Sequence, residues 1–237
     1  DYPAVVDILR SSFEDLAAGR AQVHPRQRTD AGGFRLSSMG AVWGARKVAG
    51  LKVYPTVQGQ FSFLITLFDL ENNQPLAVLD GAEVTKFRTA GITAMVARQA
   101  ARKGAKRLAL VGAGFQGRAQ AWALCHFFRF EEIAVVDPVV DAQWCTQLAL
   151  HSGARVRACN AEAAVREADI VVTATRSATP VLDGAWLKPG AFVSAVGTST
   201  PKARELDDTT LSRAQRIIVE WAPQSLQEAG ELVLGIS

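Results

Sequence analysis

Six consecutive residues, Gly112-Ala113-Gly114-Phe115-Gln116-Gly117, match the pattern G-x-G-x-x-G. They follow the apolar run Leu108 to Val111 and open a stretch of helical character. In such a turn Gly112 permits a sharp bend, Gly114 lets the backbone approach a pyrophosphate, and Gly117 lets helix and strand pack closely. The new helix offers free N–H groups and the positive end of its dipole to phosphates. Glycine-rich turns also have purely structural uses, but this context predicts a dinucleotide-binding turn.

An acidic residue, Asp137, stands 20 residues after Gly117, at the end of the next apolar run. At this place a carboxylate accepts hydrogen bonds from the hydroxyls of the adenosine ribose, and it repels a 2′-phosphate. The following residues, Pro138 to Val140, bring no compensating cation. The sequence therefore favours NAD as cofactor over NADP.

The elements that must position these residues alternate between strands and helices after Gly104. Strands are expected in RLALVGAG, EEIAVVD, ARVRACN, DIVVTAT, GAFVSAVGT and RIIVEW, with helices between most of them. This alternation predicts a Rossmann-type, doubly wound parallel sheet. Because ligands bind beyond the carboxyl ends of parallel strands, Thr175, Val196 and Gly197 are expected near the cofactor, although ordinary strand-to-loop chemistry would also place such residues there.

The first hundred residues have a different texture. A helix is expected over residues 3–18, then short strands from Val23 to Asp80 in a small antiparallel sheet, then a long helix over 82–103. The most apolar run, Phe61 to Leu70, is interpreted as a buried strand. The fold class is therefore α/β, with a second, smaller α+β domain. We expect a substrate-binding and dimerisation domain over 1–104, an NAD-binding domain over 105–225, and in 226–237 the start of a return to the first domain.

Composition narrows the possible partners. The 26 basic and 23 acidic side chains nearly balance and form no basic run, which argues against nucleic acid. No apolar stretch reaches the roughly 18 residues of a membrane span, and the amino-terminal residues do not resemble a signal peptide. Three cysteines without CxxC spacing predict no metal site and fit a reducing cytoplasm.

Three cations in the first domain are candidates for holding a substrate carboxylate: Arg28 in a loop, Lys52 among apolar neighbours, and Arg88 in the long helix. Taken from spacing alone, each is more simply interpreted as a solvated surface charge.

A resemblance to a known family favours the first interpretation of these cations, as groups that hold a substrate carboxylate. The segments PRQRTD, GLKVYP, LAVLDGAEVTKFRTAGITA, LVGAGFQGRAQ, ADIVVTAT and LKPGAFVSAVGTSTPKARELDD resemble the ornithine cyclodeaminase/mu-crystallin family over nearly the whole chain. The resemblance implies that Arg28, Lys52 and Arg88 surround the substrate carboxylate. It also implies that Thr89 and Gln116 lie near the cofactor phosphates, and that the protein is a homodimer joined through the sheet of the first domain.

Two departures from the family pattern matter. Ornithine cyclodeaminases carry an Asp after the fifth strand as acid/base, and Ser199 aligns with it here. A serine hydroxyl has no pKa near neutrality, so Lys52, or a water held by Ser199, is the expected proton relay. Family members also start slightly earlier and continue past residue 237.

These observations favour an NAD-dependent oxidoreductase that transfers a hydride at the α-carbon of a small amino or imino acid. One alternative is ornithine cyclodeaminase, a lyase that converts ornithine to proline and ammonia. Another is a dinucleotide-binding protein without turnover, of the mu-crystallin type.

Overall fold

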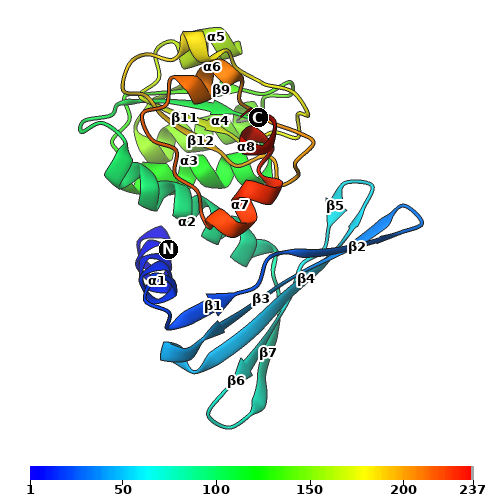
Figure 1. Cartoon of the computed structure of the whole chain (residues 1–237). Helices are drawn as coiled ribbons and strands as arrows, with labels where there is room; N and C mark the ends of the chain where they lie inside the picture. Colours follow the sequence, from blue (N-terminus) through cyan, green and yellow to red (C-terminus); the bar gives the residue numbers. More distant parts are fainter. Residues whose placement is uncertain (236–237) are drawn as a thin grey trace. The chain divides into compact units, whose positions relative to one another are not determined.

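The computed structural model describes residues 1–235, which divide into two compact units, coloured blue to cyan and green to red in Figure 1. The division falls between Arg88 and Thr89, inside helix α2 (Ala82–Ala100). One unit contains an antiparallel sheet and the other a parallel sheet, which confirms the predicted fold class. The domain boundaries drawn at residues 104 and 225 stay a prediction, and residues 236–237 of the predicted return segment lie outside the described residues.

The first unit consists of helix α1 (Tyr2–Ala17), an antiparallel sheet and the start of α2. Asp1 caps α1 by accepting a hydrogen bond from the N–H of Ala4 at 3.0 Å. The sheet runs in the order β1-β3-β4-β6-β7, with β2 added beside β3 and β5 beside β4. The strands are β1 (Ala21–Val23), β2 (Gln27–Ala31), β3 (Phe34–Trp43), β4 (Val48–Val57), β5 (Gln60–Phe61), β6 (Leu64–Asp69) and β7 (Gln74–Asp80).

Helix α1 is attached to the sheet through Asp15. Its carboxylate accepts hydrogen bonds from the indole Nε1 of Trp43 at 2.6 Å and from Nε of Arg20 at 2.8 Å. The bond from Trp43, followed by that from Arg20, holds the pKa of Asp15 below its usual 3.8. The charged carboxylate therefore joins the end of the helix to the end of β3.

The two faces of this sheet differ in chemistry. The register pairs Lys52 with Met39 and with Ile65, and residues directly opposite in an antiparallel pair share a face. We call this side the Lys52 face. The alternate residues form the opposite side, which we call the apolar face, and large apolar side chains there are 43–66% exposed. These residues are Leu36, Val42, Leu64, Phe68 and Val78.

The interpretation of Phe61 to Leu70 as a buried strand was wrong. The segment does contain β6, but Phe61, Leu64, Phe68 and Leu70 are each 43–52% exposed. Strand periodicity sends alternate side chains to opposite faces, and these apolar side chains meet no covering element within the described chain.

The second unit contains a five-stranded parallel sheet in the order β10-β9-β8-β11-β12. Its strands are β8 (Arg107–Val111), β9 (Glu132–Val136), β10 (Arg155–Ala158), β11 (Ile170–Thr173) and β12 (Phe192–Ala195). Its helices after α2 are α3 (Phe115–Phe127), α4 (Ala142–Ser152), α5 (Ala161–Val165), α6 (Asp208–Ser212), α7 (Ala222–Glu228) and α8 (Gly230–Gly235). Strand order reverses between β8 and β11, which creates a topological switch point at the carboxyl end of β8. The central strands are buried, as near-continuous apolar runs predict.

The sixth strand expected in RIIVEW is absent from the described residues. Residues 216–221 form an irregular segment between α6 and α7, and the side chains of Ile217 and Ile218 are about half exposed. β-branched residues favour strands only where a neighbouring strand supplies a ladder, and in the described sheet β12 is the edge.

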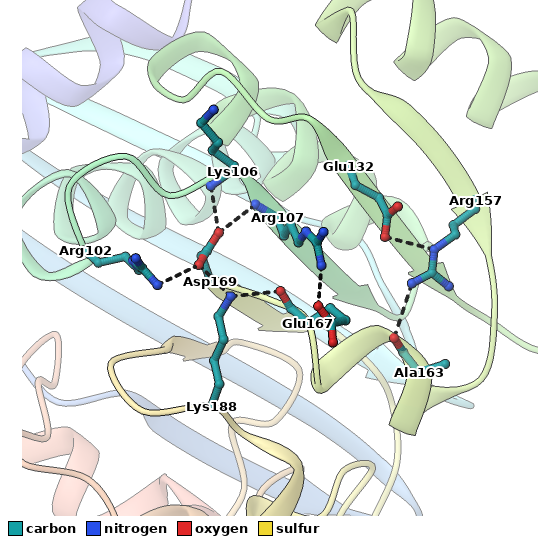
Figure 2. A network of polar contacts seen from close by, with 9 residues as sticks. All are labelled: Arg102, Lys106, Arg107, Glu132, Arg157, Ala163, Glu167, Asp169 and Lys188. Atoms are coloured by element: carbon teal, nitrogen blue, oxygen red, sulfur yellow. Dashed lines mark hydrogen bonds and ion pairs between the residues drawn. The ribbon is translucent and has the colours of Figure 1, made fainter.

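The amino-terminal edge of the parallel sheet is held by the buried carboxylate of Asp169 (Figure 2). It accepts hydrogen bonds from the backbone N–H groups of Lys106 and Arg107 at 2.8 and 2.9 Å, and it pairs with Nζ of Lys188 at 2.7 Å. Burial by itself would raise the pKa of Asp169, but these bonds outweigh burial and lower it below 3.8. This anchor fixes the end of the sheet opposite to the glycine turn.

Candidate functional site

The glycine turn connects β8 to α3 at the switch point, as predicted. Gly112 has φ +93°, and a Cβ there would lie 2.7 Å from the carbonyl oxygen of Ala174. A Cβ on Gly117 would lie 1.8 Å from the carbonyl oxygen of Gly112. The protein's own backbone therefore requires glycine at both positions, whatever the turn binds.

Gly114 is different, because the protein itself does not require a glycine there. Its φ of −74° and ψ of −164° suit any residue, and an added Cβ would meet no atom within 4 Å. Gly114 is also the N-cap of α3, and no side chain caps that end of the helix. The first turn of α3 thus has N–H groups without a side-chain cap, and the space at the Gly114 Cβ position beside it is open, an arrangement that suits a bound phosphate.

Asp137 lies beside this turn. One carboxylate oxygen accepts a hydrogen bond from the N–H of Ala113 at 2.7 Å, and the other accepts one from the N–H of Val139 at 2.9 Å. The carboxylate therefore fixes the glycine turn against the end of β9. A carboxylate has about four acceptor positions, so capacity remains for hydroxyl groups of a ligand.

Gln116 occupies the first turn of α3. Its amide Oε1 is buried and has no hydrogen-bond partner, and a buried acceptor without a partner costs about 1–3 kcal/mol. Thr89, on α2, is half-buried and lies one turn before Thr93, whose hydroxyl is 3.1 Å from that of Ser194 on β12. The short connection from α2 to β8 makes the two run in opposite directions, so Thr89 lies toward the edge with the glycine turn.

The ends of β11 and β12 are joined by one carboxylate that the sequence did not reveal. Glu205 is fully buried and accepts hydrogen bonds from the hydroxyl of Thr173 and from the N–H and hydroxyl of Thr175. It also accepts one from the N–H of Gly197 at 2.7 Å. The predicted residues Thr175, Val196 and Gly197 therefore belong to two segments that Glu205 holds side by side.

Ser199 follows β12 by four residues and is exposed. It lies at the same edge of the sheet as Thr175 and Gly197, in the segment that runs toward α6. The structure thus places the predicted cofactor residues of the second unit, and Ser199 with them, along the carboxyl edge of the parallel sheet.

Arg28 was expected in a loop but lies in strand β2, because residues 27–31 pair with β3. The register of the sheet brings Arg28 and Lys52 to one face. Arg28 pairs with Ser37, Ser37 pairs with Tyr54, and Lys52 precedes Tyr54 by two residues, so all four side chains belong to the Lys52 face. The Lys52 ammonium lies 4.3 Å from the ring centre of Phe63 and 5.3 Å from that of Tyr54. At this distance the face of an aromatic ring attracts an ammonium group. Lys52 is therefore a half-buried cation, not a solvated one.

The start of α2 brings the third cation to this group. Nζ of Lys52 donates a hydrogen bond to Oγ1 of Thr85 at 2.8 Å, and Thr85 donates to the carbonyl oxygen of Gly81 at 2.6 Å. Arg88 lies three residues after Thr85, which puts it on the same side of the helix. Sequence reasoning missed Thr85, although its place in the segment LAVLDGAEVTKFRTAGITA, three residues before Arg88, was a usable signal.

Other chemistry finds little support in the part of the chain that the structure describes. It contains no group of three or more His, Cys, Asp or Glu side chains arranged to hold a metal. The cysteines in it are free, and burial raises the pKa of the Cys125 thiol to about 12, so this thiol stays protonated at neutral pH. No helix within these residues combines the length and the apolar character needed to cross a bilayer.

The model of the ornithine cyclodeaminase/mu-crystallin family matches residues 3–235. The chain belongs to this family. Ketimine reductase mu-crystallin of Rattus norvegicus is 33% identical over 171 residues, which is 72% of this chain and 54% of the rat protein. The aligned part of the chain therefore spans about half the length of the rat protein.

Solved structures of similar proteins share the fold of this chain. The probable ornithine cyclodeaminase from Bordetella pertussis Tohama I is 43% identical with a TM-score of 0.96, covering 99% of this chain and 75% of that one. The iminosuccinate reductase of Paracoccus denitrificans, solved in complex with NAD+, is 26% identical with a TM-score of 0.90, covering 99% and 76%. Both likenesses extend over the two units described above.

Proposed function

We propose that this protein is an NAD-dependent oxidoreductase that transfers a hydride at the α-carbon of a small amino or imino acid. The observation that carries the proposal is the open space at Gly114, beside a first turn of α3 that no side chain caps. Family membership supports it, because the rat relative is named a ketimine reductase and the Paracoccus relative is an NAD+-bound reductase.

The residues at the glycine turn fit this cofactor. The uncapped first turn of α3 receives the diphosphate, and Gly114 leaves room for it. The orphaned Oε1 of Gln116 accepts a hydrogen bond from a group of the ligand. Asp137 accepts from the hydroxyls of the adenosine ribose and disfavours a 2′-phosphate, so NADP is the weaker ligand. Gly112, Gly117, Thr175, Val196 and Gly197 shape the edge of the sheet, and Thr89 lies toward the phosphates.

The first unit supplies the substrate side. Arg28 and Arg88 bind and orient the substrate carboxylate, as planar guanidinium groups do. Lys52, held by Thr85 and two aromatic rings, assists at the carboxylate or donates a proton at the substrate nitrogen. The alternative proton relay is a water held by Ser199 of the second unit. The nicotinamide, when bound, supplies the hydride chemistry, and the protein contributes position and electrostatics.

Ornithine cyclodeaminase is the second candidate, favoured by the 43% identity to the Bordetella protein of that probable name. Ser199 argues against it, because a serine hydroxyl does not replace the carboxylate that amine elimination uses. Feeding ornithine and measuring proline and ammonia at constant NADH separates the two reactions, since only the reductase changes the net amount of NADH.

The direct experiment is a screen for NADH oxidation by the purified chain, over small 2-oxo acids with ammonia or methylamine and over cyclic imino acids. Consumption of NADH with any of these substrates supports the proposal. Binding of NADH without consumption across the whole panel would instead support a dinucleotide-binding protein without turnover.

We further propose that the protein is a homodimer joined through the apolar face of the antiparallel sheet. Isolated apolar side chains are common on protein surfaces, but the register places five large ones on this face, each 43–66% exposed: Leu36, Val42, Leu64, Phe68 and Val78. A contiguous apolar patch of this kind marks an interface.

A further inference from the structure

Glu205 is a fully buried carboxylate whose four hydrogen bonds come from neutral groups. One oxygen accepts from the N–H of Thr175 at 2.6 Å and from its hydroxyl at 2.7 Å. The other accepts from the hydroxyl of Thr173 at 2.8 Å and from the N–H of Gly197 at 2.7 Å. Each carboxylate oxygen therefore has two hydrogen-bond partners, one backbone N–H and one threonine hydroxyl.

These donors come from two segments of chain that leave the sheet at neighbouring strands. Thr173 ends β11 and Thr175 follows it, while Gly197 follows β12. Backbone pairing between the strands stops at Thr173 and Ala195. Beyond that point the carboxylate of Glu205 links the two segments, because its oxygens accept hydrogen bonds from both of them.

Glu205 is itself held by a second carboxylate. Its N–H donates to Oε1 of Glu231 on α8 at 2.9 Å, and the hydroxyl of Thr198 lies 3.2 Å from Oε2 of the same residue. Glu231 is 9% exposed. The segment that carries Glu205 is thereby fixed to α8 and to the residue after Gly197.

The place of Glu205 along the sheet edge gives it a specific relation to the cofactor. Asp137 marks the side of the glycine turn that binds adenosine, and β11 and β12 lie on the other side of the switch point. A dinucleotide bound across this edge extends its nicotinamide half over the ends of β11 and β12. The ring is positively charged when oxidised and neutral when reduced, so a buried anion nearby favours the oxidised form.

We propose that Glu205 is a positioning residue for the nicotinamide half of the cofactor. It fixes the segments after β11 and β12, and its buried charge raises the affinity for NAD+ relative to NADH. The proposal rests on the proposed function, because it requires that the edge of this sheet binds a nicotinamide coenzyme.

Two substitutions at Glu205 separate the effect of side-chain length from the effect of negative charge. Glu205→Asp keeps the charge but is one methylene shorter, so it cannot reach all four donors. Glu205→Gln keeps the reach but removes the charge and turns an NH2 group toward two of the donors. Glu162→Gln is the matched control, because Glu162 is an exposed carboxylate on α5 of the same unit, paired with Arg166.

The first measurement is amide hydrogen exchange of the ligand-free protein. We expect the N–H groups of Thr175 and Gly197 to exchange at least about tenfold faster in Glu205→Asp, and at least one of them to do so in Glu205→Gln. The N–H of Ala174, which donates to the carbonyl oxygen of Val111 at 2.8 Å, serves as the internal reference. Unchanged exchange of Thr175 and Gly197 in both variants overturns the bracing role.

The second measurement is the ratio of Kd for NAD+ to Kd for NADH, by calorimetry. We expect Glu205→Gln to raise this ratio about fivefold and Glu205→Asp to change it less than about twofold. A residue with a merely structural role weakens both forms equally, so an unchanged ratio in Glu205→Gln overturns the electrostatic role. If the unsubstituted protein binds neither coenzyme, the proposed function is wrong, and the proposal for Glu205 is wrong with it. Normal coenzyme binding with unchanged exchange and ratio in the variants sinks the Glu205 proposal alone.

Discussion

The antiparallel sheet and the parallel sheet of this chain bury their apolar side chains to different degrees. Ile170, Val171 and Val172 of β11 have no exposed surface, whereas Leu64 and Val78 of the antiparallel sheet are 48% and 66% exposed. Within the described residues, helices of its own unit flank the parallel sheet, whereas large apolar side chains on one face of the antiparallel sheet stay exposed. The comparison teaches that the second unit buries its own core, while the first unit leaves one apolar face exposed.

The largest expected effect tests whether the second unit depends on its own backbone packing for stability. In Gly117→Ala the new Cβ would lie 1.8 Å from the carbonyl oxygen of Gly112. This clash involves backbone atoms, so a side-chain rotation cannot relieve it. Helix propensity favours alanine by only about 1 kcal/mol, so we expect a net loss above about 3 kcal/mol. Urea unfolding followed by far-ultraviolet circular dichroism measures it.

Gly114→Ala is the matched control for that substitution, because its Cβ would meet no atom within 4 Å. We expect this variant to keep its unfolding midpoint and to lose about tenfold in NADH affinity. Equal destabilisation by the two substitutions would contradict the assignment of Gly114 to the ligand and of Gly117 to the fold.

The next effect concerns the opposite edge of the same sheet. Asp169→Ala leaves two backbone N–H groups without their acceptor and removes one acceptor of the Lys188 ammonium, which keeps its bond to the carbonyl oxygen of Glu167. Breaking a buried pair costs about 3–5 kcal/mol, and since Lys188 and Arg102 are partly exposed we expect about 2–3 kcal/mol. Denaturant unfolding at neutral pH checks the value.

The pH dependence follows from the lowered pKa of Asp169. A carboxyl whose pKa is depressed by folding contributes stability that is fully present above its unfolded pKa of about 3.9, and that is lost as the pH falls through the folded value. We therefore expect the difference between the unsubstituted protein and Asp169→Asn to shrink as the pH is lowered below about 4. A difference that stays constant with pH would show that the carboxylate charge is not what holds this edge.

A substitution in the first unit sharpens the division of labour between the two regions. We expect Arg88→Ala to lower kcat/KM about 100-fold through loss of a charge-assisted bond to the substrate carboxylate, while Kd for NADH stays unchanged. Arg166→Ala, which removes an exposed cation at the C-cap of α5, is the control. Turnover that survives in Arg88→Ala would remove Arg88 from the substrate site.

The smallest expected effect tests the uncovered face. Val78→Lys places a charge on the apolar face, and we expect it to weaken dimerisation about tenfold or more without lowering the stability of the monomer. Val139→Lys is the control, since Val139 is 83% exposed and lies in the other unit. Sedimentation velocity over a concentration series measures the change, and an unaffected dimer would exclude this face as the interface.

Much of the second unit could be predicted from sequence because parallel strands are short apolar runs bounded by helices with clear caps. Asp141, for example, caps α4 by accepting from the N–H of Trp144. The segment RIIVEW is also a short apolar run, but a run of this kind does not show whether a neighbouring strand is available for pairing. The run from Phe61 to Leu70 failed for a related reason, since hydrophobicity does not say what covers a face.

The candidate site divides in the same way. The glycine turn and Asp137 are close in sequence to the elements that position them, so their spacing was informative. Glu205 was not predicted, because its donors Thr173, Thr175 and Gly197 come from two strands 8 to 32 residues away. A lone Glu between β12 and α6 carries no periodic signal that would single it out.

The account depends on a diphosphate bound at the first turn of α3, with Asp137 selecting the unphosphorylated ribose. Calorimetric titration of the chain with NADH and, separately, with NADPH tests this most directly. The account predicts that NADH binds and that NADPH binds at least about tenfold more weakly. Failure to bind either coenzyme, or equal affinity for the two, would contradict it.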